Sequence, residues 1–307
     1  MNDLRVAAVV MRSGFGEIER NLARMEHFAG QAAEQGVDVV CFPEMNITGY
    51  ALKEEVAKYA ESVPGPSANE VRHMASRHNV AILAGLAEKT EGNGIAITQV
   101  VALPDGSMST YRKLHLSLGE QAFFQAGCDI PLFRYGEAMF GVQLCYDAHF
   151  PELSSIMALK GAEVIFMPHA SPPPESADEK KNRWLRYLAA RAYDNSVFVV
   201  ACNQTGDGGA GIRFAGVALA LDPRGEIIAE TSGAEERMIV AELKSDLLRK
   251  TRETRMGFFL AHRRPELYSG LVAPMDESLL ERTHSSNCFF EAKPPEGAAK
   301  ARTVSDS

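Results

Sequence analysis

Residues 4–42 read LRVAAVVMRSGFGEIERNLARMEHFAGQAAEQGVDVVCF, and this stretch indicates the fold class. Leu4 to Met11 form a mainly apolar run that is typical of a buried strand. Apolar residues then recur at helical spacing from Glu17 to Gln35, and Gly36 predicts the end of that helix. Val37 to Phe42 form a second apolar run. A strand, a helix and a strand in this order predict an α/β domain in which helices cover a sheet.

The alternation of helices and strands continues along the chain. Helical spacing predicts further helices over residues 52–60, 69–78, 151–160 and 178–194. Apolar runs predict strands over residues 80–87, 138–144, 163–167, 197–202 and 237–243. Two turn-like sequences, Pro104-Asp105-Gly106 and Asp222-Pro223-Arg224-Gly225, predict hairpins over residues 95–111 and 212–231.

A domain boundary is expected near residue 255. No linker-like segment interrupts residues 1–250, so we predict one domain over residues 1–255. Beyond it the periodic pattern weakens, and Lys293 to Ser307 are rich in Pro, Ala, Lys and Ser. We therefore expect a C-terminal extension over residues 256–307 that first contacts a partner chain and is then disordered.

The composition argues against several classes of protein. The chain has 307 residues, 46% of them hydrophobic, and a formal net charge of -8 with scattered basic residues. A substantial core is therefore possible, and nucleic acid is not expected as a partner. The N-terminal apolar run is short and Asp3 precedes it, so neither a signal peptide nor a membrane span is predicted.

The cysteines are odd in number and widely spaced, and no two of them form a C-x-x-C pair. They are Cys41, Cys128, Cys145, Cys202 and Cys288. The pattern predicts neither a redox motif nor a zinc knuckle. It fits a reducing compartment, and we expect a cytoplasmic protein.

Three polar residues stand where predicted strands or hairpins end. Cys145 lies at a turn between a strand and a helix, where an exposed thiol could act as a nucleophile and the Tyr146 N–H could bind an oxyanion. Glu44 follows a buried strand and a proline, and Lys113 follows the first hairpin. Taken singly, Cys145 could be a core residue, Glu44 a loop acid or helix cap, and Lys113 a solvated lysine.

The joint pattern of motifs is more specific than any single residue. The motifs are F-P-E-x-x-x-T-G-Y at 42–50, Y-R-K-L-H-L at 111–116, G-E-Q-x-x-F-x-x-G at 119–127 and C-Y-D-x-H-F-P-E at 145–152. At these residues the chain resembles the nitrilase superfamily, also called the carbon-nitrogen hydrolases. The catalytic glutamate, lysine and cysteine of that family correspond to Glu44, Lys113 and Cys145. Arg191–Asn195 and Cys202–Gly206 extend the resemblance, which covers roughly residues 4–250.

The resemblance implies a four-layer α-β-β-α sandwich, a homodimer or larger homo-oligomer, and a small-molecule substrate. In the implied reaction Glu44 is the general base, Lys113 stabilises the thiolate and the oxyanion, and Cys145 forms a thioester. No metal or organic cofactor is required. Glu120 stands where the amide-cleaving branches carry a second glutamate that orients the substrate or the lysine. Its ordinary alternative is a solvent-facing acid at the start of a helix.

The residues after the nucleophile favour one class of substrate. Tyr146 and Asp147 stand where nitrile-cleaving members generally have tryptophan and glutamate, so an amide or N-carbamoyl compound is predicted and a nitrile is the alternative. The candidate substrate-binding residues lie beside the motifs or after the strand ending at Met167, with packing as their alternative role. They are Tyr50, Phe124, Tyr146, His149, His169, Ala170 and Ser171.

Several neighbouring residues receive more specific expectations. His149 could contact a substrate carboxylate or cap the following helix. Arg191, Asn195 and Asn203 are expected to hold the scaffold together. The run Ser171-Pro172-Pro173-Pro174-Glu175 departs from the family pattern, and a rigid polyproline stretch there could reshape the pocket wall.

Two readings outside hydrolysis remain. One is a metal site, because Cys145, Asp147 and His149 are potential ligands that His115 and His169 could join. No paired-ligand spacing recurs, which argues against it. The other is a non-enzymatic thiol sensor or binding protein that uses Cys145. Such a sensor needs a lowered thiol pKa but no second acid, so the presence of Glu44 and Lys113 argues against it.

Overall fold

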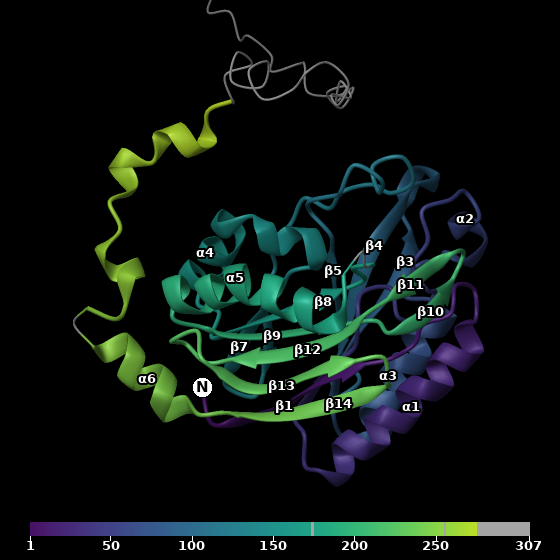
Figure 1. Ribbon diagram of the computed structural model, residues 1–307, viewed down its shortest axis with the longest axis horizontal. Coiled ribbons are helices and arrows are strands. Elements are labelled where there is room, and N and C mark those ends of the chain that lie inside the picture. Colours follow the sequence, from purple (N-terminus) through teal and green to yellow (C-terminus); the bar gives the residue numbers. More distant parts are fainter. Residues whose placement is uncertain (173–174, 255, 275–307) are drawn as a thin grey trace, which may run out of the picture. The chain divides into compact units, whose positions relative to one another are not determined.

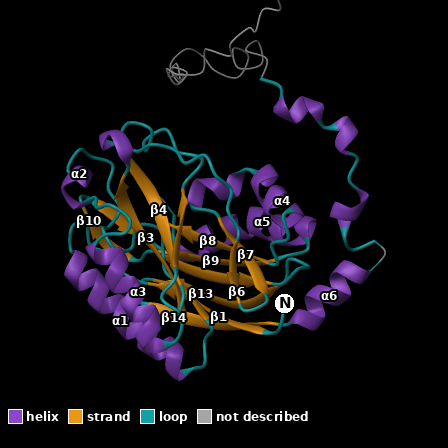
Figure 2. Ribbon diagram, turned by 180° about the vertical axis from the view of Figure 1, so that it is seen from behind, coloured by secondary structure: helices purple, strands orange, loops and turns teal. Residues whose placement is uncertain are grey.

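The structure is a computed structural model that describes residues 1–172, 175–254 and 256–274 (Figure 1). The chain divides after His262 into two units, of which the first carries the sheets. Within the first unit, two six-stranded sheets lie face to face between two layers of helices (Figure 2). The α-β-β-α sandwich predicted from the family resemblance is therefore confirmed.

The first sheet has the strand order β14-β1-β2-β3-β4-β5. Its strands are β1 (Leu4–Val10), β2 (Val39–Cys41), β3 (Ala81–Lys89), β4 (Ile95–Ala102), β5 (Met108–Arg112) and β14 (Arg237–Leu243). Strands β1, β2 and β3 are parallel, whereas β14, β4 and β5 join them in antiparallel pairs. The predicted first hairpin is β4–β5, in which Val100 lies opposite Thr110.

The second sheet has the order β13-β12-β9-β8-β7-β6. Its strands are β6 (Phe133–Tyr135), β7 (Ala138–Val142), β8 (Val164–His169), β9 (Phe198–Asn203), β12 (Gly216–Leu221) and β13 (Ile227–Gly233). The parallel strands β7, β8 and β9 are again central. Between β9 and β12 in the sequence, β10 (Gly206–Gly209) and β11 (Ile212–Phe214) form a separate antiparallel pair. The two sheets thus share one plan, a parallel centre with antiparallel edges.

The α-helices described in the first unit are α1 (Ile18–Glu34), α2 (Val56–Tyr59), α3 (Pro66–His78), α4 (Pro151–Leu159), α5 (Ala177–Asn195) and α6 (Ser245–Glu253). The 3-10 helices are η1 (Glu91–Asn93), η2 (Cys145–His149) and η3 (Phe259–His262). Helices α1 and α3 lie along one outer face, and α4 and α5 lie along the other (Figures 1 and 2).

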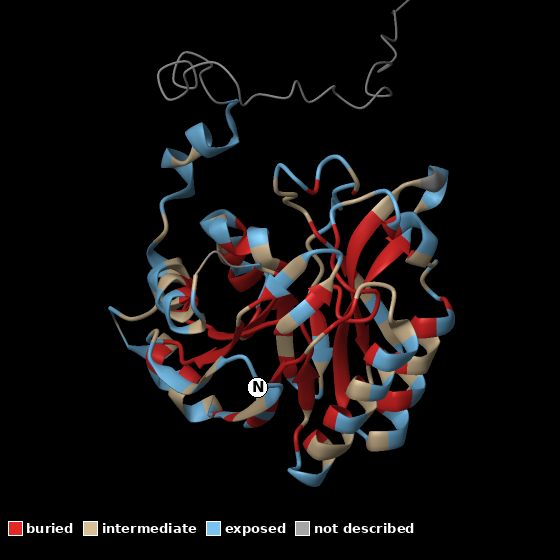
Figure 3. Cartoon of the chain, turned by 45° about the vertical axis from the view of Figure 1, so that its right-hand side comes forward, coloured by how far each residue is buried: buried red, intermediate tan, exposed pale blue. Residues whose placement is uncertain are grey.

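The side chains of β1 and β2 explain why their sequences are apolar without alternation. Val6, Ala8 and Val10 join one hydrophobic cluster, which also contains Trp184 and Leu188 of α5. Ala7 and Val9 join the other cluster, which contains residues of α1 and α3. Each strand is therefore buried on both faces, as the red strands of Figure 3 show.

Several element boundaries differ from the sequence predictions. The helix expected over residues 52–60 is only α2, because residues 52–55 form bends and turns. Helix α3 begins at Pro66 and not at residue 69, since proline suits the first helical turn. The strand expected over residues 212–221 is divided at Ala215 into β11 and β12. Strands β6 and β10 and helix α6 were not predicted, because they are short or polar.

In its described residues, 263–274, the second unit has two 3-10 helices, η4 (Pro265–Leu267) and η5 (Ser269–Val272). The predicted disorder of Lys293 to Ser307 falls outside the described residues, as do Cys288, Pro173 and Pro174. The proposed boundary at residue 255 stays a prediction. None of the helices in the described part of the chain is long and apolar enough to cross a membrane.

Candidate active site

The candidate catalytic residues lie at the ends of strands from both sheets. Glu44 is in the turn that follows β2, and Lys113 directly follows β5. Cys145 is the first residue of η2, after β7, and Ala170 directly follows β8. Because carboxyl ends of parallel strands meet at one edge of a sheet, segments far apart in the sequence can converge here.

Lys113 joins two carboxylates in the interior. Its Nζ donates to Glu44 Oε1 at 2.8 Å and to Glu120 Oε1 at 2.7 Å. The Lys113 and Glu44 side chains have no exposed surface, and that of Glu120 is 3% exposed. Glu120 is therefore not the solvent-facing acid of the alternative reading, and Lys113 is not a solvated lysine.

Further donors hold Glu120 in place. The Tyr50 hydroxyl donates to Glu120 Oε1 at 3.0 Å, and the Ser117 N–H donates to Glu120 Oε2 at 2.8 Å. Tyr50 is buried and its ring meets Phe214 edge to face. Tyr50, a predicted substrate-binding residue, thus contacts the same Glu120 oxygen that accepts from Lys113. Phe124 is buried in the main hydrophobic cluster, one turn after Glu120.

Glu44 is held by backbone and side-chain donors from the second sheet. Its Oε2 accepts from the Ala170 N–H at 2.8 Å, and its carbonyl oxygen accepts from Gln204 Nε2 at 2.8 Å. Burial, opposed by the charge of Lys113 and aided by that of Glu120, raises the pKa of Glu44 to about 7. A carboxyl group with this pKa can gain or lose a proton near neutral pH, as a general base must.

Lys113 remains charged in this setting. Burial alone lowers the pKa of Lys113, but the charges of Glu44, Cys145 and Glu120 outweigh it and raise the pKa above its ordinary value. A permanent ammonium between carboxylates is suited to stabilising negative charge and unsuited to accepting a proton.

Cys145 adopts a left-handed backbone conformation, with φ of 46°. This conformation is uncommon for a residue with a side chain and is frequent at active-site turns. Burial and the charges of Glu44 and Glu120 raise the pKa of the Cys145 thiol, while Lys113 and the Ala170 N–H act in the opposite direction. The thiol is therefore protonated at rest and electrostatically coupled to all three polar partners.

Asp147 fixes the turn that carries Cys145. Its buried carboxylate accepts from the Leu144 N–H at 3.0 Å and the Tyr111 hydroxyl at 2.7 Å. It also accepts from the N–H and ring Nδ1 of His115, both at 2.8 Å. These bonds tie the Cys145 turn to the segment that carries Lys113.

The proposed metal ligands are engaged in other contacts. Both carboxylate oxygens of Asp147 already accept hydrogen bonds from protein donors. His169 Nδ1 contacts the Met167 carbonyl at 2.7 Å. Among residues 1–172, 175–254 and 256–274, no group of three or more His, Cys, Asp or Glu side chains is placed to hold a metal ion. The observed contacts of Asp147 and His169 are protein hydrogen bonds.

Aromatic side chains of α5 and η2 stand next to the nucleophile. The His149 ring lies 4.5 Å from that of Tyr187 and 5.6 Å from that of Tyr146. His149 does not cap α4, whose N-cap is Phe150 without a side-chain hydrogen bond. Tyr146 is 40% exposed, so it can meet a bound molecule.

The His169 ring lies against that of Trp184, with the ring centroids 3.9 Å apart and the ring planes tilted by 31°. Burial lowers the pKa of His169 to about 3, so the ring is neutral near pH 7. Its Nδ1 must carry the proton that is donated to the Met167 carbonyl, which leaves Nε2 as an acceptor.

The predicted scaffold residues make structural contacts. Arg191 Nε donates to the Ala148 carbonyl at 3.1 Å, and Asn195 Nδ2 donates to the Arg191 carbonyl at 2.9 Å. Asn203 Nδ2 donates to the carbonyls of Ser171 and Ala215.

Sequence reasoning did not find the α5 residues that face this region. They are Lys180, Arg183, Trp184 and Tyr187. Their i, i+3, i+4 and i+7 spacing marks one face of the helix and was the available signal. Gln204 gave no signal of its own.

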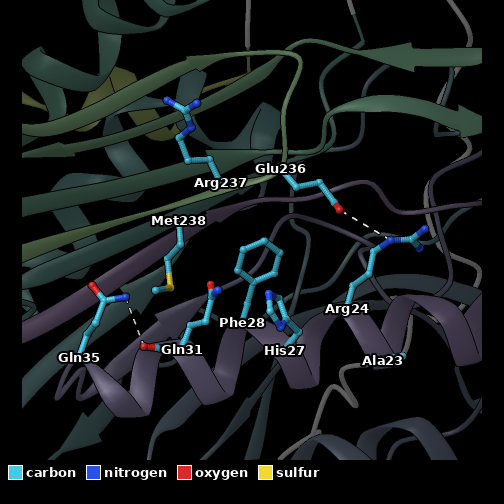
Figure 4. A pocket seen from close by; sticks show the side chains of 9 residues that line it. All are labelled: Ala23, Arg24, His27, Phe28, Gln31, Gln35, Glu236, Arg237 and Met238. Carbon is cyan, nitrogen blue, oxygen red and sulfur yellow. Dashed lines mark hydrogen bonds and ion pairs between the residues drawn. The ribbon is translucent and has the colours of Figure 1, made fainter.

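A surface pocket of about 690 Å³ lies elsewhere, between α1 and β14 (Figure 4). It is lined by Ala23, Arg24, His27, Phe28, Gln31, Gln35, Glu236, Arg237 and Met238. Arg24 pairs with Glu236 at 3.6 Å, and Arg237 pairs with Glu235 at 2.8 Å. Both cations are therefore already neutralised, and the pocket contains none of the candidate catalytic residues.

Comparison with known proteins agrees with this geometry. Residues 5–253 match the family model described as carbon-nitrogen hydrolase. The chain is 33% identical over 269 residues to a protein named nitrilase from Pyrococcus abyssi, covering 86% of this chain and 99% of that one. It is 30% identical over 286 residues to an N-carbamoylputrescine amidase from Arabidopsis thaliana, covering 86% and 93%. The solved structure of Saccharomyces cerevisiae Nit3, a member of branch 10 of the nitrilase superfamily, is similar with a TM-score of 0.75 and 25% identity, covering 83% of this chain and 95% of that one.

Proposed function

Because this chain belongs to the carbon-nitrogen hydrolase family, we propose that it hydrolyses a small amide or N-carbamoyl compound through a thioester on Cys145. The observation that carries the proposal is the buried group in which Lys113 bridges Glu44 and Glu120 beside the Cys145 turn. It combines a thiol, a base near neutrality and a permanent cation, which thioester chemistry requires.

The first half of the reaction forms the thioester. Glu44 takes the proton of the Cys145 thiol, and the sulfur attacks the carbonyl carbon of the substrate. Lys113 and the Tyr146 N–H stabilise the negative oxygen of the tetrahedral intermediate. The C–N bond then breaks, and Glu44 returns the proton to the leaving nitrogen, so that ammonia or an amine departs.

The second half regenerates the enzyme. Glu44, again unprotonated, takes a proton from water, and the resulting hydroxide attacks the thioester carbon. The C–S bond breaks, the acid leaves, and Cys145 recovers its proton from Glu44. Glu120 keeps its carboxylate on Lys113 throughout and so acts as a positioning residue for the ammonium.

Amide and carbamoyl substrates are favoured by Tyr146-Asp147 after the nucleophile and by the N-carbamoylputrescine amidase relative. We place the substrate beside Tyr146, His149, His169, Ala170 and Ser171. A nitrile is the second candidate, because the relative at 33% identity is named nitrilase.

A substrate panel tests the proposal directly. Simple amides, N-carbamoyl amino acids, N-carbamoyl amines and nitriles are incubated with wild type and Cys145→Ala, and released ammonia is measured. We expect ammonia from at least one amide or carbamoyl compound with wild type and none with Cys145→Ala. Turnover by Cys145→Ala would refute the mechanism, and release from nitriles alone would select the second candidate. Oxidant-dependent partner binding without any turnover would favour the thiol-sensor reading.

We also propose a cytoplasmic homodimer. Exposed apolar side chains on neighbouring helices support a second copy: Ile156 and Leu159 of α4 are 40% and 49% exposed, and Tyr193 of α5 is 50% exposed. Light scattering of the purified chain should give about twice the monomer mass of 33.4 kDa.

A further inference from the structure

Lys180 is a fully buried cation that the proposed mechanism does not use. It lies in the first turns of α5, and its side chain has no exposed surface. Burial and the nearby charge of Arg183 lower the pKa of Lys180. Enclosing an ammonium costs free energy unless acceptors replace water, so its contacts identify what the side chain does.

The contacts of Lys180 use its whole donor capacity. Its Nζ donates to Ser171 Oγ at 3.0 Å and to the Pro172 carbonyl at 3.2 Å, and it pairs with Glu175 Oε1 at 3.4 Å. An ammonium group has three N–H donors, so none remains for the anionic group of a substrate. Glu175 is held in addition by Arg183, whose Nε donates to it at 3.0 Å.

The segment held by Lys180 carries the backbone donor of Glu44. Residues 170–172 follow β8 and belong to no helix or strand, so their conformation depends on such side-chain bonds. Asn203 fixes the segment on one side: its Oδ1 accepts from the Ser171 N–H at 2.9 Å and its Nδ2 donates to the Ser171 carbonyl at 3.0 Å. The Ala170 N–H, one residue earlier, meets Glu44 Oε2 at 2.8 Å.

From this geometry we propose that Lys180 is a positioning residue: its buried ammonium holds the Ala170–Pro172 segment so that the Ala170 N–H remains on the Glu44 carboxylate. The inference rests on the proposed function in assigning Glu44 the role of base. It adds a residue of α5 to the machinery of the site.

The expected sign follows from the hydrogen bond. The Ala170 N–H stabilises ionised Glu44 and so lowers its pKa. Weakening that bond must raise the pKa of Glu44. Lys180→Met, which keeps most of the length of the side chain and removes the ammonium, should therefore move the acid limb of the pH profile upward by about 0.5–1 unit.

Other charged groups near Glu44 must be considered. Lys113 and Glu120 act on Glu44 directly, and the Cys145 thiol is coupled to it. His169, the last residue of β8, is neutral near pH 7. Removing the charge of Lys180 would itself raise the pKa of Glu44 through space. Ser171→Ala separates the two causes, because it removes one contact of Lys180 and leaves the charge in place.

Two measurements are made on wild type, Lys180→Met and Ser171→Ala, with Lys181→Met as the matched control. Lys181 is the adjacent lysine on α5, and it pairs with Glu230 at 3.1 Å, away from this segment. The first measurement is kcat/KM against pH. The second is alkylation of Cys145 by iodoacetamide against pH, in which the Cys145 S–C bond forms, iodide leaves and Glu44 accepts the thiol proton. It is followed by mass spectrometry of the Cys145 peptide, so that other cysteines do not interfere.

We expect the midpoint of both profiles to rise in Lys180→Met, to rise less in Ser171→Ala, and to stay at the wild-type value in Lys181→Met. Below the midpoint, kcat/KM of Lys180→Met should fall by roughly 3- to 10-fold with less change in KM. A wild-type midpoint in Lys180→Met would overturn the proposal. So would a shift in Lys180→Met without one in Ser171→Ala, because charge alone would explain it. If wild type hydrolyses nothing in the panel, the alkylation profile still decides the role of Lys180, and only the proposed function fails.

Discussion

Asp147→Asn tests how the turn of the nucleophile is anchored. The Asp147 carboxylate is fully buried, and each of its oxygens accepts two hydrogen bonds. Oδ1 accepts from the N–H and ring Nδ1 of His115, and Oδ2 accepts from the Tyr111 hydroxyl and the Leu144 N–H. Asparagine has the same shape but replaces one oxygen by an NH2 donor. The two protein groups that donated to the replaced oxygen then face this NH2 group and lose their acceptor.

The cost can be estimated from these bonds. A hydrogen bond to a charged group contributes about 1.5–3 kcal/mol, and a buried polar group left without a partner costs about 1–3 kcal/mol. With two bonds lost and partial rearrangement, we expect the free energy of unfolding to fall by about 3–5 kcal/mol, a large part of the ~5–15 kcal/mol of a typical domain. The Cys145 turn, at φ of 46°, loses its restraint, so iodoacetamide should alkylate Cys145 with an altered rate and turnover should fall at least about 10-fold.

Urea unfolding monitored by circular dichroism measures the stability. The matched control is Asp105→Asn, because Asp105 lies in an exposed turn, where its side chain accepts from the Ser107 N–H at 2.8 Å. That variant should lose less than about 1 kcal/mol. If Asp147→Asn unfolds at the same urea concentration as wild type, the buried carboxylate does not anchor the turn and the reasoning is wrong.

Four further predictions concern the catalytic group. Cys145→Ala should lower turnover by roughly 10⁴-fold or more while urea unfolding changes little, and an unstable variant would contradict a purely chemical role. Since the pKa of Glu44 rises from 4.5 to about 7 on folding, kcat/KM should increase with pH through about 7. The same pKa shift stabilises the folded state most below pH 4.5, and this stabilisation is lost as the pH rises to about 7. The free energy of unfolding of wild type should therefore decrease more than that of Glu44→Gln between pH 4.5 and 7. Lys113→Met leaves Glu44 and Glu120 without their shared cation. The free energy of unfolding should therefore fall by about 3–5 kcal/mol, and turnover should be lost. A stable, active variant would rule out the bridging role.

Local sequence patterns were sufficient for the order of the main elements. The apolar run from Leu4 to Met11 predicts a strand buried on both faces, and β1 does bury both of its faces. The helix predicted over residues 178–194 is α5, whose start is reinforced by a capping box between Ser176 and Glu179. The two hairpins also follow from their turn residues. These features depend on periodicity and turn chemistry, which neighbours in the sequence determine.

The same local patterns failed where tertiary packing decides the outcome. Residues 52–55 form bends and turns despite helical spacing, and Ala215 divides what looks like one strand. Sequence motifs indicated Glu44, Lys113, Glu120 and Cys145 as candidates, but they could not assign the burial that raises the pKa of Glu44. Their catalytic roles stay predictions until the variants are assayed.

The sequence by itself therefore determined the alternating α/β pattern, the family resemblance and the residue types available for chemistry. Only the tertiary structure decided that Asp147 ties Lys113's segment to the Cys145 turn and that Lys180 reaches the loop beside Glu44. The physical reason is range: helix and strand patterns reflect contacts between near neighbours, whereas these hydrogen bonds join side chains that meet only after both sheets and α5 have packed.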